Sequence, residues 1–131
     1  MILNEQLMKK KSIDLNSFKK GLFFLSLGGI GEIGANCYLY GCDGKWIMID
    51  LGLSFADEKY PGIDLLIPKI DFVDQIKTNL IAIIISHGHE DHAGAVSFLS
   101  DKINCPVYAT SFVKLLIENR LKEFGKLENL D

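Results

Sequence analysis

Residues 81–94 constrain the fold and function of this chain more than any other stretch, because an apolar run there ends in a cluster of metal-binding side chains. Residues 81–85 are apolar and rich in isoleucine, which favours a strand buried on both faces. Residues 86–92 follow directly and contain all three histidines of the chain together with two carboxylates. Open α/β sheets place their ligand sites at the carboxyl ends of their strands. The sequence therefore predicts a binding site in the loop after this strand.

The spacing of these side chains indicates how they would bind metal. In an extended turn, His87 and His89 project to the same side and can bind one ion. Asp91 and His92 then face a second position as the chain enters a helix. Imidazole nitrogen and carboxylate oxygen suit Zn²⁺, and Mn²⁺ where oxygen ligands are added. Each ion needs further ligands from elsewhere in the protein.

Two other interpretations of the motif are a solvated histidine-rich turn and a single structural zinc site. The solvated turn requires this ligand order to follow a strand by chance, which argues against it, and the single structural zinc is the less favoured metal site. Glu90 lies between ligands on an alternating loop. We therefore expect Glu90 outside the ligand set, in a solvated or ligand-orienting role.

The remaining sequence predicts an α/β fold with an antiparallel start to its sheet. Three strands joined by turns are expected at 22–27, 36–40 and 45–49. A long irregular loop is expected at 54–68, followed by a short helix at 70–77.

After the motif, a helix is expected to begin beyond His92, and a strand to follow at 106–109. Thr110 or Ser111 is expected to cap a second helix, which ends before Gly125. The buried stripe of this helix is predicted to contain four apolar residues: Val113, Leu116, Ile117 and Leu121.

The glycine-rich segment 28–34 has two interpretations. Its glycines would provide the positive φ angles of a tight connection between strands. Alternatively, the loop faces substrate and its backbone amides approach a phosphate. The residues proposed for this substrate-side loop are Gly29, Gly31, Glu32 and Asn36. No helix follows directly, which argues against a dinucleotide-binding or P-loop motif.

Composition argues against a strongly basic nucleic-acid-binding protein, a disulfide-rich protein and a membrane-spanning protein. The net charge of −3 gives no global basic signature. Residues 1–20 carry five lysines and are expected to be poorly ordered, as a solvated leader or as a basic arm that contacts RNA. The three cysteines are odd in number and lack a Cys-x-x-Cys pair, which favours reduced thiols in the cytoplasm. No apolar run approaches the roughly 20 residues of a membrane span.

The motif at 86–92 resembles the signature of the metallo-β-lactamase superfamily. Blocks at 27–37, 49–52 and 61–68 resemble the opening of the ribonuclease J family, in order and in spacing. The resemblance implies the N-terminal half of an αββα sandwich, a mixed sheet with helices on one face. Residues 21–131 would form this partial domain, with the β-CASP and C-terminal regions absent.

The ribonuclease J resemblance implies a metal-dependent RNA hydrolase that cleaves phosphodiester bonds, exo- and endonucleolytically, in RNA processing and decay. Two Zn²⁺ ions would be held by His87, His89, Asp91 and His92. Asp91 and His92 would form the catalytic centre, where Asp91 also orients the nucleophile. Asp50 would lie beneath the site and orient the histidine loop by hydrogen bonding.

An acidic loop similar to the one around Asp64 has been linked to calcium in that family. The residues themselves favour a solvated loop, with a Ca²⁺ site at Asp64 as the alternative.

The chain departs from the family because no histidine follows His92, whereas the family has a later histidine, a bridging aspartate and a final histidine. We therefore expect the chain to be inactive alone, with an uncovered apolar sheet face that favours self-association or a partner chain supplying the missing half. A non-catalytic remnant and another hydrolase of the same fold, such as a thioesterase, are the alternative functions.

Overall fold

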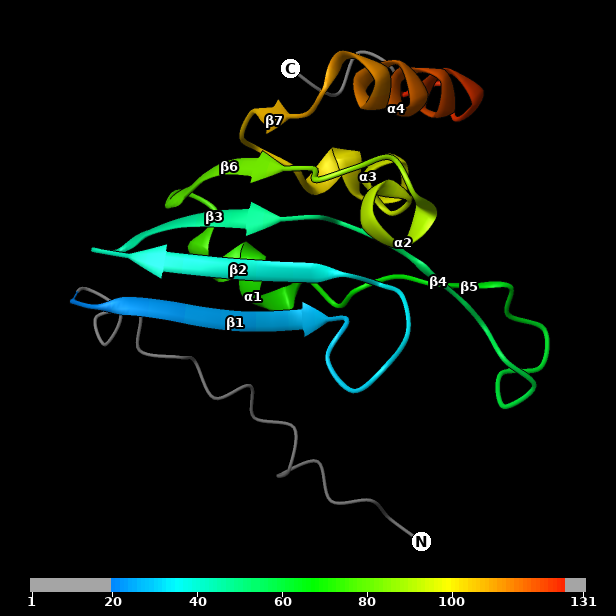
Figure 1. Cartoon of the computed structure of the whole chain (residues 1–131), viewed down its shortest axis with the longest axis horizontal. Helices are drawn as coiled ribbons and strands as arrows, with labels where there is room; N and C mark the ends of the chain where they lie inside the picture. Colours follow the sequence, from blue (N-terminus) through cyan, green and yellow to red (C-terminus); the bar gives the residue numbers. More distant parts are fainter. Residues whose placement is uncertain (1–19, 127–131) are drawn as a thin grey trace, which may run out of the picture.

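The sheet has five strands in the order β1-β2-β3-β6-β7, within the residues 20–126 that the computed structural model describes (Figure 1). β1 (Leu22–Gly28), β2 (Cys37–Cys42) and β3 (Lys45–Ile49) pair antiparallel as consecutive hairpins. β6 (Leu80–Ile84) then pairs parallel to β3, and β7 (Val107–Tyr108) pairs parallel to β6. The α/β class and the five expected strands are confirmed. Apart from Lys20, the expected leader lies outside the described residues.

The expectation that the strand at 81–85 is covered on both faces is wrong. Leu80, Ala82 and Ile83 are buried, but Ile81 is 50% exposed and Ile84 is 38% exposed. The helices pack against only one face of the sheet, so side chains on the other face of β6 meet no second layer. The exposed positions do not follow strict alternation, because the pairing of β6 with β3 shifts register between Leu80 and Ala82 and leaves Ile81 as an extra residue.

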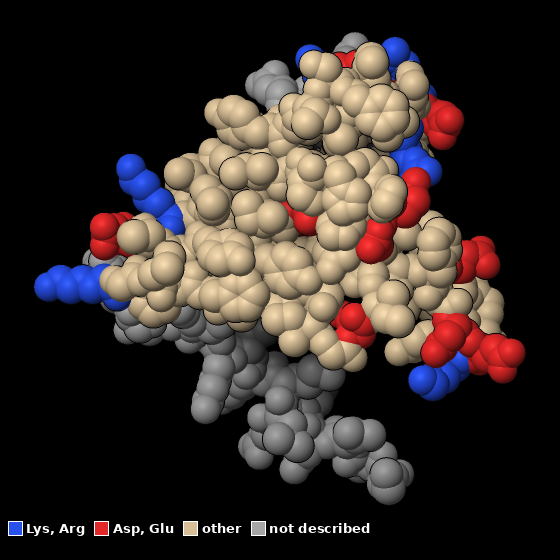
Figure 2. Space-filling model, viewed as in Figure 1, with Lys and Arg blue, Asp and Glu red and all other residues tan. Residues whose placement is uncertain are grey.

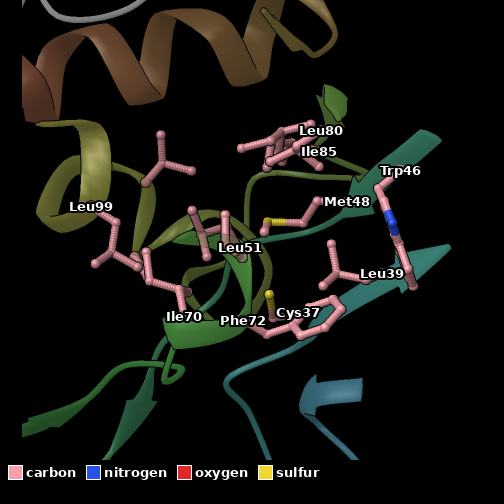
Figure 3. Close-up of a cluster of buried hydrophobic side chains, with 14 of the residues drawn as sticks. Cys37, Leu39, Trp46, Met48, Leu51, Ile70, Phe72, Leu80, Ile85 and Leu99 are labelled. Carbon is pink, nitrogen blue, oxygen red and sulfur yellow. The ribbon is translucent and has the colours of Figure 1, made fainter. Parts of the chain in front are cut away.

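The hydrophobic core lies between the covered face of the sheet and the helices (Figure 3). Trp46 and Met48 of β3 contribute to this core with residues of α1 (Asp71–Ile76) and α3 (Val96–Leu99). The ring of Phe72 meets Trp46 edge-on, with 5.4 Å between ring centroids. Such edge-to-face packing stabilises a core beyond the area it buries.

The opposite face of the sheet carries apolar side chains in register across the strands. Phe24 faces Tyr40 between β1 and β2, and Ile84 faces Tyr108 between β6 and β7. All four side chains are exposed. Figure 2 shows that few charged side chains cover the strands on this side. We call this surface, with Ile81, the open face; it matches the uncovered apolar face expected from the sequence.

The segment 54–68 is not wholly irregular, in contrast to the expectation. β4 (Ser54–Phe55) and β5 (Leu65–Leu66) pair antiparallel, and Ala56 N–H donates to the Asp64 carbonyl over 2.9 Å. Leu65 packs against the core, which anchors this small two-stranded sheet.

The helix at the metal motif begins earlier than expected. α2 (Glu90–Ala93) starts at Glu90, so Asp91 and His92 are already helical, and α3 follows after Gly94 and Ala95. A 3₁₀ turn at Ser100–Lys102 (η3) leads toward β7. No helix in residues 20–126 has the length and apolar character required to cross a membrane.

The last helix, α4 (Ser111–Glu123), has the predicted ends. The Thr110 side chain caps it by accepting from Val113 N–H at 3.4 Å, and Gly125 follows its end with a φ of +66°. Leu116 is 41% exposed, so its assignment to the buried stripe is wrong. Val113 and Leu121 alone are fully buried on α4 because the helix contacts the domain along a narrow line.

Cys37 lies in the core beside the metal motif, and its burial predicts low reactivity. Burial, with a smaller contribution from the Asp50 charge, raises the pKa of the Cys37 thiol to about 12. In a chain whose other two cysteines are serine, we expect thiol reagents at pH 8 to modify Cys37 about a thousandfold more slowly than in the urea-unfolded chain. A chain that keeps only the exposed Cys42 is the control and should react rapidly. Rapid labelling of folded Cys37 would contradict the prediction.

Candidate metal centre

The loop after β6 brings the four predicted ligands together in two pairs. His87 Nε2 lies 3.2 Å from His89 Nδ1, and Asp91 Oδ2 lies 3.4 Å from His92 Nε2. The pairs are adjacent, because the rings of His87 and His92 are 4.0 Å apart between centroids. These are the pairs that the sequence assigns to separate ions.

The donor chemistry and spacing of each pair fit a metal ion. Zinc bonds of about 2.0–2.2 Å to nitrogen and oxygen place two ligands of a tetrahedron about 3.3 Å apart. Both pairs are close to that separation. Within residues 20–126, however, no group of three or more His, Cys, Asp or Glu side chains is arranged to hold one ion. Each pair therefore needs donors in addition to its own two.

Asp50 holds the histidine loop in place from below. Its side chain is buried, with Oδ1 accepting from Ser86 N–H at 2.7 Å and Oδ2 from the Ser86 hydroxyl at 2.9 Å. The same Oδ2 lies 2.7 Å from His92 Nδ1. A carboxylate oxygen accepts, so Nδ1 carries the ring proton and Nε2 carries the lone pair. These contacts join Asp50 to the histidine loop, and its role in orienting metal ligands stays a prediction.

The backbone after β3 is joined to the metal motif by hydrogen bonds. Leu51 N–H donates to the His92 carbonyl at 2.8 Å, and Leu53 N–H donates to the Glu90 carbonyl at 2.9 Å. Gly52 lies between these bonds, where a Cβ atom would be only 1.7 Å from the Asp91 carbonyl oxygen. Sequence reasoning assigned no role to Gly52, although a glycine directly after the strand-end Asp-Leu is the signal for so close a contact.

The glycine-rich loop lies beside this site and has the backbone that the first interpretation requires. Gly29 has a φ of +80° and Gly31 a φ of +77°. Glu32 is exposed, and its Oε1 accepts from Gly29 N–H at 3.2 Å. Asn36 directs its amide nitrogen at the Asp91 carbonyl, 3.0 Å away. A phosphate-facing role for these residues stays a prediction.

Glu90 is turned away from the four predicted ligands. Its carboxylate forms an ion pair with the Arg120 guanidinium of α4. This contact anchors α4 to the metal motif. Sequence reasoning missed Arg120, since no local pattern connects two residues that lie 30 positions apart.

Asp64 lies far from the histidines in sequence and is exposed on the loop that carries β5. Its backbone carbonyl is used by Ala56. Calcium binding at Asp64 stays a prediction.

Comparison with known families identifies this arrangement. The family model of the metallo-beta-lactamase superfamily matches residues 30–128, which include the complete motif. The chain belongs to the metallo-beta-lactamase superfamily. Membership implies bound metal ions, in agreement with the donor pairs. The five-stranded sheet with helices on one face corresponds to half of the superfamily fold.

Among curated relatives, this superfamily member is similar to ribonuclease J. It is 48% identical to Ribonuclease J of Sinorhizobium meliloti over 101 residues, which are 74% of this chain and 18% of the relative. It is 37% identical to Ribonuclease J 2 of Staphylococcus aureus over 116 residues, 88% of this chain and 20% of the relative. The chain thus spans about a fifth of the length of these relatives.

Asp50→Asn tests the support beneath the metallo-beta-lactamase motif. The amide nitrogen would replace one of the two oxygens that accept from Ser86 and His92, so a buried N–H donor would face another donor. We expect a loss of about 3 kcal/mol in the free energy of unfolding, and about a 10- to 100-fold loss of zinc affinity. Urea titration and calorimetric zinc titration measure the two effects. Asp57→Asn, which removes an exposed pair with Lys59, should change stability by less than about 0.5 kcal/mol.

Gly52→Ala tests the close contact between the strand end and α2. The added methyl group would overlap the Asp91 carbonyl, so we expect a loss of at least about 3 kcal/mol in unfolding free energy. Gly62→Ala is the matched control, because Gly62 has a φ of +81° and open space around it. That control should lose only about 1 kcal/mol from backbone strain. Equal losses for the two variants in urea titrations would refute the steric argument.

Proposed function

We propose that this chain forms the metal-binding front part of an RNA hydrolase of the ribonuclease J type, which cleaves phosphodiester bonds in RNA. The observation that supports this proposal most is the grouping of possible metal ligands at one strand end, His87 with His89 and Asp91 with His92. The chain that carries them is similar to ribonuclease J. RNA is the proposed substrate, in both exo- and endonucleolytic cleavage during RNA processing and decay.

Zinc is the proposed metal, because imidazole nitrogens supply three of the four donors. Mn²⁺ is the alternative, since added oxygen ligands suit it. The ions would supply Lewis-acid activation of water and neutralise charge on the phosphodiester. Asp91 would accept a hydrogen bond from the attacking water and so orient it. His92 would be held for metal binding by its bond to Asp50.

The remaining donors are proposed to come from outside the described residues. Each pair supplies two donors, whereas zinc in proteins usually has four ligands. A further layer packed on the open face would bury Phe24, Tyr40 and Ile81 and bring new side chains to the strand ends. That layer is proposed to be the remaining part of the domain, carried by the same protein or by a partner chain, with a second copy of this chain as the alternative. Without it, we expect the chain to be inactive.

The cytoplasm is the proposed location, because all three cysteines are free. A Ca²⁺ ion at Asp64 is the remaining metal proposal. Asp64 is exposed and its loop also carries Asp57 and Glu58, which gives the loop its acidic character.

Metal stoichiometry and RNA cleavage, measured on one sample, test this function. The purified chain should bind substoichiometric zinc and leave a 5′-monophosphorylated RNA intact. Addition of a chain that carries the missing half should raise the zinc content to two ions and start cleavage. Cleavage of a thioester but not of RNA by that assembly would refute the proposal in favour of a thioesterase. Zinc-free assembly without either activity would indicate a non-catalytic remnant.

His89→Ala tests the ligand assignment. Loss of one donor from the His87–His89 pair should lower the zinc content of the active assembly by about one ion per chain. Glu90→Gln is the matched control in the same loop, since Glu90 faces Arg120 and not the donors. Elemental analysis of both variants should show zinc loss only for His89→Ala; retained zinc would rule out His89 as a ligand.

A further inference from the structure

The Asn36 carboxamide makes several hydrogen-bond contacts with the candidate metal centre. Its Nδ2 lies 3.0 Å from the Asp91 carbonyl oxygen, 3.2 Å from Asp91 Oδ2 and 3.2 Å from His92 Nε2. A carbonyl oxygen only accepts, which places the NH₂ group on this side. On the other side, Asn36 Oδ1 accepts from the Tyr38 hydroxyl at 2.8 Å. The orientation of the carboxamide is therefore determined at both ends.

The hydrogen bond to His92 uses the only lone pair of that ring. Because Nδ1 donates its proton to Asp50, the neutral imidazole has a single accepting nitrogen, Nε2. The two N–H groups of the Asn36 amide are shared among the Asp91 carbonyl, Asp91 Oδ2 and Nε2, and Nε2 can only accept from them. A metal ion bound by His92 would require the same lone pair. The amide and a cation thus exclude each other at this atom.

We propose that Asn36 competes with the metal ion for His92, so that a cation binds to the Asp91–His92 pair only when the amide moves away. This inference rests on the proposed metal-dependent function and makes Asn36 a residue that sets metal affinity. Tyr38 strengthens the competition by fixing the amide. Gly29 leaves room for it, since a Cβ there would lie 2.3 Å from the Tyr38 hydroxyl oxygen and 2.5 Å from Asn36 Oδ1.

The carboxamide is not needed to hold the ligands in place. Asp50 fixes the His92 ring at 2.7 Å, and the backbone N–H of residue 51 donates to the His92 carbonyl. The Asn36 backbone N–H also donates to the Asp91 carbonyl at 3.0 Å and is retained in any substitution other than proline. Loss of the side chain therefore frees the lone pair while the pair keeps its position.

Calorimetric titration of the 131-residue chain with Zn²⁺ alone tests the competition. Asn36→Ala should bind Zn²⁺ about fivefold more tightly than the wild type, the effect of one hydrogen bond. Tyr38→Phe keeps the ring and removes the hydroxyl that fixes the amide, so its zinc affinity should rise about twofold. This variant replaces Asn36→Ala in the test if Asn36→Ala does not fold. Asn79→Ala is the matched control, because that carboxamide donates to the Gly44 carbonyl. It should leave zinc affinity unchanged.

Nitrogen-15 NMR of the metal-free chains supplies an independent readout. The His92 Nε2 resonance should shift between the wild type and Asn36→Ala, because the ring loses its donor, and should stay in place in Asn79→Ala. Equal or weaker zinc affinity of Asn36→Ala, or an unmoved Nε2 resonance, would overturn the competition alone. Zinc binding by none of the isolated chains would overturn this inference, whereas the metal-dependent function would fall only if the assembly that supplies the further donors also bound no zinc.

Discussion

The carboxylate of Asp50 is the group on which the site depends, because it joins three parts of the chain at one point. Asp50 follows β3, Ser86 follows β6, and His92 belongs to α2. A buried carboxylate is stable only where donors surround it, and the two donors of Ser86 and the His92 ring meet that need. The φ of +61° at Asp50 turns the chain so that this occurs. The single Asp50 carboxylate therefore fixes both the position of the histidine loop at Ser86 and the tautomer of the His92 ring.

Local pattern accounts for the elements that could be predicted from the sequence. Alternation and turn residues located the strands, and Thr110 with Gly125 marked the ends of α4. The same patterns could not tell how many layers cover an element. An isoleucine run suits a strand covered once or twice, so the exposure of Ile81 and Ile84 depends on what packs beyond the sheet.

The contacts within the site were less predictable, because they join residues far apart in the chain. The motif order placed the four donors in their pairs, since the spacing is local. Asn36 and Asp91 lie 55 positions apart, and their bond follows from the contact between the start of β2 and α2. The Tyr38 hydroxyl donates to the Asn36 carboxamide from two positions further along the chain. Strand alternation places these two side chains on the same face, so this contact could have been predicted from the sequence.

A further layer packed on the open face would bury its apolar side chains and could also supply the donors that each two-donor pair lacks. Ile84 and Tyr108 end the open face at the edge where Ser86 begins the histidine loop. Apolar burial contributes about 25 cal/mol for each Å² removed from water, so a layer seated on this face would gain most of its association energy there. The same layer would reach the strand ends, where donors are missing. In the proposed assembly, binding of the layer and completion of the metal centre would be coupled: metal would favour the assembled state, and assembly would raise metal affinity by the same factor.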